Sequence, residues 1–142
     1  MRKYLAVILG TVISNVIFLI IGVLANTISP TPPELMDSRT PEAVAQRVAA
    51  TPTFTWISVI VGLAVGAFFG GMLGAKTAKS EKLWVTTGVG LLLSVWAFYT
   101  FYIVYPDVLW VPLAMLVSGF LFSFLGGLIF GRSAPTNPPL TN

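Results

Sequence analysis

Residues 54–75 decide the fold, and their sequence is FTWISVIVGLAVGAFFGGMLGA. This stretch contains no Asp, Glu, Lys or Arg, and it is as long as the roughly 20 apolar residues that a helix needs to cross a bilayer. Within it Gly62, Gly66, Gly70 and Gly74 recur at every fourth residue. At 3.6 residues per turn these positions lie nearly in line along one side of a helix. The stretch therefore predicts a transmembrane helix with a groove free of side chains.

Three further stretches have the same length and composition. The predicted spans cover residues 5–25, 54–75, 83–105 and 108–131. None shows the period-two alternation of barrel strands, and apolar runs of this length satisfy their backbone hydrogen bonds in lipid as helices. The first span could instead be a secretory signal, but its apolar run exceeds the ~7–15 residues of a signal core. We therefore predict an all-α polytopic membrane protein, in which four transmembrane helices form an antiparallel bundle and a single domain.

The composition of the whole chain excludes other classes of protein. Of its 142 residues, 56% are hydrophobic and 9% are charged, and the mean hydropathy is +0.88. A soluble domain has about 25% charged residues, so a soluble enzyme and a disordered chain are both excluded. The chain has no Cys and no His, which are common nucleophiles, general bases and metal ligands. We expect no catalytic residue, no metal and no cofactor; a membrane enzyme using Asp107 or Glu81 is the least favoured class.

The basic residues predict the orientation. With four spans, both termini lie on the same side as the loop 76–82. That side holds six of the eight Lys and Arg residues, namely Arg2, Lys3, Lys76, Lys79, Lys82 and Arg132. The opposite side holds Arg39 and Arg47, so the positive-inside rule places both termini on the cytoplasmic side of the membrane. The pI of about 9.5 follows from this asymmetry and does not indicate a nucleic-acid partner.

Residues 26–53 form the predicted external segment between the first two spans. Thr40, Pro41 and Glu42 are typical of a helix start, with an N-cap, a proline at the first position and an acid in the first turn. A short helix over residues 41–50 would place Val44 and Val48 on one face, as a candidate contact for a partner or for lipid. The cytoplasmic tail, residues 132–142, contains three prolines and is expected to be flexible.

Stripes of small residues are the candidate helix-packing interface. Ser58 extends the stripe of the second span, and the fourth span carries Gly119, Ser123, Gly127 and Gly131. Such stripes let helices approach closely. Packing within the bundle is the first interpretation; an interface with another subunit or a second copy, and a glycine-lined conduction path, are the alternatives.

A faint repeat accompanies the stripes. Gly70-Gly71 precedes Lys76 at the same offset at which Gly126-Gly127 precedes Arg132. This repeat is typical of a parallel duplication of two helical hairpins, although snorkelling basic residues near the ends of the spans would produce part of it.

Polar and aromatic side chains inside the spans are the other candidates. Thr11, Ser14 and Asn15 form the polar cluster of the first span, with Thr11 and Asn15 on one face. They predict adhesion between helices, and ligand or ion binding is the alternative. Trp96 and Phe98 lie deeper than the outer aromatic belt. They are candidates for contact with a partner, a lipid tail, a quinone or a carotenoid, unless they pack between helices.

The order of these features resembles a known but uncharacterised family of small four-helix bacterial integral membrane proteins. The resemblance rests on a first span, a proline-rich stretch, Thr40-Pro41-Glu42-Ala43-Val44 and a second span with Phe68-Phe69-Gly70-Gly71. It covers most of residues 12–131. The first span ends in Gly22-Val23-Leu24, where the family often has an acidic residue. The resemblance implies the topology and a bacterial origin, and it implies no reaction.

These observations predict a non-catalytic membrane protein that serves as an accessory or stabilising subunit of a larger bacterial complex, of respiratory or photosynthetic type. Its expected partners are the lipid bilayer and other membrane subunits or a second copy. A small oligomeric channel or transporter is the alternative. Proton-coupled transport needs an embedded carboxylate, which no span contains, and a passive pore would need Thr11, Ser14 and Asn15 to surround water.

Overall fold

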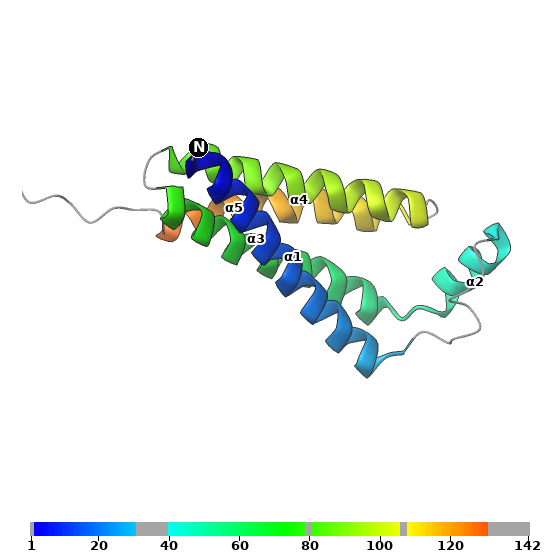
Figure 1. The fold of residues 1–142 in the computed structure, drawn as a ribbon. Coiled ribbons are helices and arrows are strands. Elements are labelled where there is room, and N and C mark those ends of the chain that lie inside the picture. Colours follow the sequence, from blue (N-terminus) through cyan, green and yellow to red (C-terminus); the bar gives the residue numbers. More distant parts are fainter. Residues whose placement is uncertain (1, 31–39, 79–80, 106–107, 131–142) are drawn as a thin grey trace, which may run out of the picture.

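The computed structural model describes residues 2–30, 40–78, 81–105 and 108–130. These residues form five helices: α1 (Arg2–Ile28), α2 (Pro41–Ala50), α3 (Thr53–Ala78), α4 (Lys82–Val104) and α5 (Trp110–Phe130) (Figure 1). All but α2 are long and apolar enough to cross a membrane. The prediction of an all-α chain with four such helices is confirmed, with each helix end within three residues of the predicted span. The tail 132–142 lies outside the described residues.

The short helix α2 occupies the residues that the sequence predicted for it. The Thr40 side chain accepts a hydrogen bond from the backbone N–H of Ala43 at 3.4 Å, and Pro41 stands at the first position, where its missing N–H is harmless. At the other end, the N–H of Thr51 donates to the carbonyl oxygens of Arg47 and Val48. Local capping interactions are therefore present at both ends of this helix.

The four long helices alternate in direction. The starts of α1 and α4 lie together, because Lys3 Nζ is 2.9 Å from Glu81 Oε2 and the rings of Tyr4 and Trp84 meet edge to face at 5.7 Å. The ends of α3 and α5 lie at the same end of the molecule (Figure 1). Helix α3 packs against α1, α4 and α5. Figure 1 shows α1 moving away from α4 toward its C-terminal end.

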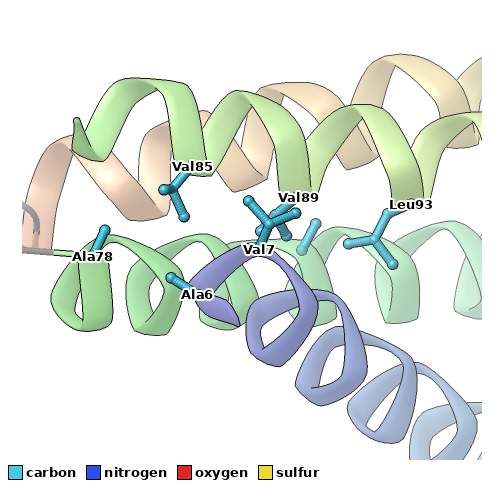
Figure 2. Packing of buried hydrophobic residues seen from close by; sticks show 7 residues of the cluster. Ala6, Val7, Ala78, Val85, Val89 and Leu93 are labelled. Atoms are coloured by element: carbon cyan, nitrogen blue, oxygen red, sulfur yellow. The ribbon is translucent and has the colours of Figure 1, made fainter. Parts of the chain in front are cut away.

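The buried hydrophobic side chains form two clusters. The first lies near the start of α1 and comprises Ala6, Val7, Ala67, Ala78, Val85, Val89 and Leu93; Figure 2 shows Val7 of α1 beside Val89 of α4. The second lies near the start of α3 and comprises Trp56, Leu63, Ala97, Val108, Val111 and Met115. Most bulky apolar side chains lie on the outside instead. Of the four long helices, α1 is the least covered. In its most apolar 18-residue segment 17% of the residues are buried, against 44% in that of α3.

Single-cysteine labelling tests this arrangement, because the natural chain contains no Cys. Thr77→Cys and Thr53→Cys lie at opposite ends of α3, and Leu91→Cys lies on the outer surface of α4. In sealed membrane vesicles, a membrane-impermeant maleimide should label Thr77→Cys and Thr53→Cys from opposite sides. Leu91→Cys should stay unlabelled, since lipid covers it. Labelling of Leu91→Cys in intact vesicles would contradict the membrane assignment.

Candidate functional site

The glycine stripe of α3 is filled by α1. A Cβ added at Gly66 would lie 2.5 Å from the carbonyl oxygen of Ser14, and one added at Gly62 would lie 3.0 Å from Ile21 Cγ2. A Cβ at Gly70 would overlap the Ser14 hydroxyl and the Gly10 carbonyl. The backbones of α1 and α3 are therefore in direct contact. Of the interpretations left open by the sequence, packing within the chain describes this stripe.

Both ends of the stripe are less crowded. A Cβ at Gly74 would lie 3.1 Å from Val85 Cγ1 of α4 and 3.4 Å from the Ala6 carbonyl oxygen of α1. Gly74 thus lies where three helices meet. At the other end, Ser58 donates a hydrogen bond to the Phe54 carbonyl of its own helix at 2.8 Å. Ser58 therefore continues the stripe in the sequence, but its hydroxyl bonds within α3 and not to a neighbouring helix.

The contribution of α1 to this contact escaped the sequence analysis. A Cβ at Gly10 would lie 2.7 Å from the Gly70 carbonyl oxygen and 2.8 Å from Val89 Cγ2. Ala6, Gly10 and Ser14 are all buried and stand four residues apart, which is the same small-residue pattern as in α3. The pattern was overlooked because only one of its three members is a glycine.

The stripe of α5 faces α4. A Cβ at Gly119 would lie 2.8 Å from Ser94 Oγ, and one at Gly127 would overlap the Thr86 side chain. Ser123 lies between them and donates a hydrogen bond to the Thr86 carbonyl oxygen at 2.9 Å. This bond ties two helices together across 37 residues of sequence. The remaining member of the predicted stripe, Gly131, lies outside the described residues.

Each double glycine serves two neighbours at once. In α3, Gly70 faces α1, whereas a Cβ at Gly71 would overlap the backbone of Ser123 in α5. In α5, Gly127 faces α4, whereas a Cβ at Gly126 would overlap the Phe68 carbonyl in α3. Gly71 and Gly126 thus allow the close contact between α3 and α5, which belong to different hairpins. Sequence reasoning assigned them no packing role because they lie one residue off the stripes.

The three polar candidates of α1 separate into two environments. Ser14 is buried against α3 and donates to the Gly10 carbonyl at 2.8 Å. Thr11 donates to the Val7 carbonyl at 2.9 Å, and Asn15 Nδ2 donates to the Thr11 carbonyl at 3.0 Å. The three side chains therefore bond to the backbone of their own helix, as hydroxyls in apolar helices often do.

Thr11 and Asn15 line a groove between α1 and α4. The groove has a volume of about 430 Å³, and its other lining residues are Leu92, Leu93 and Trp96 of α4. Trp96 also meets Phe18 of α1 edge to face, at 6.4 Å between ring centroids. Because Ser14 faces α3 instead, the groove receives two of the three polar candidates.

The other aromatic and apolar candidates do not share one surface. Phe98 is half-buried and stacks on Tyr102, with 5.8 Å between ring centroids and 6° between ring planes, two residues away from the groove-lining Trp96. Val48 of α2 packs against the cluster around Trp56. Val44 is half-buried. Val48 is thus covered in part by residues of this chain.

The site offers packing surfaces and few reactive groups. Among the described residues, no three His, Cys, Asp or Glu side chains gather where they could hold a metal ion. The hydroxyl of Ser94 is buried without a hydrogen-bond partner beside Gly119. No protein-family model matches the chain, and no curated protein or solved structure shows significant similarity to it.

Adding a methyl group at the close contacts should destabilise the fold. Gly70→Ala and Gly71→Ala place a Cβ against backbone atoms of α1 and α5, and overpacking of this kind typically costs about 1–3 kcal/mol. Both variants should unfold at lower temperature in detergent, followed by the fluorescence of the tryptophans. Gly88→Ala is the matched control, because its added Cβ would meet only the two methyl groups of Val7, at 3.3 and 3.6 Å, and no backbone atom. Equal unfolding temperatures for all three variants would disprove the packing described here.

The hydrogen bond between α5 and α4 allows a second comparison. Ser123→Ala removes the bond to the Thr86 carbonyl and should lower the free energy of unfolding by about 0.6–2 kcal/mol. Ser118→Ala is the control on the same helix, since its hydroxyl donates only to Met115 of α5, at 3.2 Å. Unfolding in mixed micelles of increasing SDS content measures both. A larger loss for Ser118→Ala would contradict the assigned roles.

Proposed function

We propose that the chain is a non-catalytic integral membrane protein that acts as an accessory or stabilising subunit of a larger bacterial membrane complex. The observation that supports this role most is the distribution of side-chain size. Glycine, alanine and serine stand at the closest contacts between helices, whereas most bulky apolar side chains are exposed on the outside. A protein built in this way offers a large apolar surface to lipid and to neighbouring subunits.

The proposed topology is an antiparallel bundle of four transmembrane helices with α2 outside the bilayer. The described basic residues support it, because Lys3 and Lys82 lie at the starts of α1 and α4 and Lys76 lies near the end of α3. Lys76 Nζ is 5.4 Å from the centre of the Phe130 ring at the end of α5. By the positive-inside rule this end is cytoplasmic, as are both termini. The family resemblance in the sequence implies the same topology and a bacterial inner membrane.

The buried polar residues favour a structural role over a catalytic or proton-transporting one. The buried polar residues in the described part of the chain are Ser14, Thr86, Ser94 and Ser123, and none of them titrates near neutral pH. An ion pair in the same part of the chain, Lys3–Glu81, is solvent-exposed and joins the starts of α1 and α4. Proton transfer and proton-coupled exchange both need an ionisable group at membrane depth. A complex of respiratory or photosynthetic type would supply such groups from its other subunits.

A small oligomeric channel is the alternative that one observation favours. Thr11 and Asn15 line the groove beside α1, so several copies arranged around this side would surround a path with polar groups. Flux of ions or small solutes in proteoliposomes, abolished by Asn15→Leu, would establish this alternative. It would also rule out a purely structural role.

Co-purification tests the accessory role. The tagged chain, extracted from its native membrane in a mild detergent, should bring down a larger membrane assembly, identified by mass spectrometry. Deleting the gene should lower the amount of that assembly in the membrane without removing its activity per complex. The control is the same purification from cells that carry the tag on an unrelated four-helix membrane protein. Recovery of this chain without any other protein would overturn the proposal.

A further inference from the structure

The outer side of α1 carries a seam of six residues, of which four are exposed and two, Asn15 and Gly22, are half-buried. Leu5, Ile8, Val12 and Leu19 are each between 54% and 61% exposed, and Asn15 and Gly22 complete the series. Their spacing alternates between three and four residues, which is the heptad spacing of helices that pair along a left-handed supercoil. Two members of this seam, Asn15 and Gly22, are not explained by contact with lipid.

Asn15 is the first of them. It is residue 14 of the 27 in α1, so its carboxamide lies at the middle of the span. One N–H bonds to the Thr11 carbonyl of the same helix, and no other described residue bonds to the carboxamide. Around it, a depression of about 320 Å³ is lined by Ile8, Val12 and Leu19 of α1 and by Leu92 of α4, together with neighbouring α1 residues. A half-bonded amide at this depth is costly unless a neighbouring helix bonds to it.

Gly22 is the second. Alone among the described glycines, it would meet no atom within 4 Å if it carried a Cβ. Glycine lowers helix propensity by about 1 kcal/mol relative to alanine, and at every other described position a neighbour occupies the space that it leaves. Gly22 stands seven residues after Asn15, at the equivalent position of the next heptad. Both unexplained residues therefore face the same direction.

We propose that this seam binds the α1 helix of a second copy of the chain, in parallel, to form a two-fold symmetric dimer. Insertion into the membrane gives both copies one orientation, so each residue of one α1 lies at the depth of the same residue in the other. Asn15 then faces Asn15, and a carboxamide is complementary to itself because it has both donors and an acceptor. A different protein could bond to Asn15 only if it carried a polar group at the same depth, whereas a second copy always does. Because a two-fold axis uses the same surface on both copies, the assembly closes at two copies.

The proposed dimer uses a surface different from the one that the sequence suggested. A second copy cannot occupy the glycine stripe of α3, because α1 already fills it. The seam lies on the opposite side of α1 from Ala6, Gly10 and Ser14, which pack on α3. The contact of α1 with α3 and the proposed contact between two copies therefore use different sides of α1, and the dimer does not depend on the accessory role proposed above.

Disulfide crosslinking in native membranes tests this proposal. Leu19→Cys lies on the seam, and Ile20→Cys is its matched control, since the two residues are adjacent, similarly exposed and nearly equal in depth. Ile8→Cys, on the seam, and Leu9→Cys, beside it, form a second such pair eleven residues earlier in α1. Under mild oxidation Leu19→Cys and Ile8→Cys should form covalent dimers several times more readily than Ile20→Cys and Leu9→Cys. All four side chains lie on the outside, so the substitutions leave the fold intact.

A second arm tests the role of the amide. Asn15→Leu should lower the dimerisation constant in nanodiscs or detergent by roughly fivefold or more, and Asn15→Gln, which keeps a carboxamide, should lower it less. Equal crosslinking within each pair, or unchanged dimerisation of Asn15→Leu, would overturn the proposal. Crosslinking of Leu19→Cys to a protein of different mass would also overturn it, by showing that a foreign helix occupies the seam. That last outcome would leave the accessory role standing.

Discussion

The contact between the backbones of α1 and α3 is the interaction on which the rest of the structure depends. In lipid, burying an apolar side chain between helices gains little, because the lipid tails are equally apolar. Helices associate there by approaching closely enough to gain dispersion contacts that disordered lipid tails match less well. Gly66, Gly70 and Gly10 permit this approach, since a methyl group at any of them would meet a backbone carbonyl oxygen.

The position of α3 at the centre follows from the same constraint. A helix with one small-residue stripe has one close neighbour, whereas α3 carries glycines on two sides, at Gly70 and Gly71. It therefore packs closely on α1 and on α5, and Gly126 and Gly127 give α5 the same capacity toward α3 and α4. Large side chains cannot fit where backbones touch, so they are displaced to the surface. The outward apolar surface, from which the proposed role as a subunit is argued, is thus a consequence of how the interior is packed.

The polar groups follow a related logic. Thr11 and Ser14 satisfy their hydroxyl donors on the backbone of α1 itself, which makes them tolerable in lipid without any partner. Ser123 is different, because its bond reaches the Thr86 carbonyl of another helix and so orients α5 on α4. Asn15 has more hydrogen-bonding groups than its own helix uses. A carboxamide in this position favours association with another helix, which connects the packing of the monomer to the dimer proposed here.

The sequence alone determined the features that depend on local chemistry. Length and hydropathy located the four long helices to within three residues of their ends, and Thr40 and Pro41 located α2, because solvation and capping act on neighbouring residues. Helical periodicity also identified which small residues share a side. It did not identify what lies opposite them, since the rotation of a helix about its axis is set by contacts distant in sequence. Only the tertiary structure therefore decided that α1 fills the stripe of α3, that Gly71 and Gly126 join the two hairpins, and that Ser14 faces inward while Asn15 lines the groove beside α4.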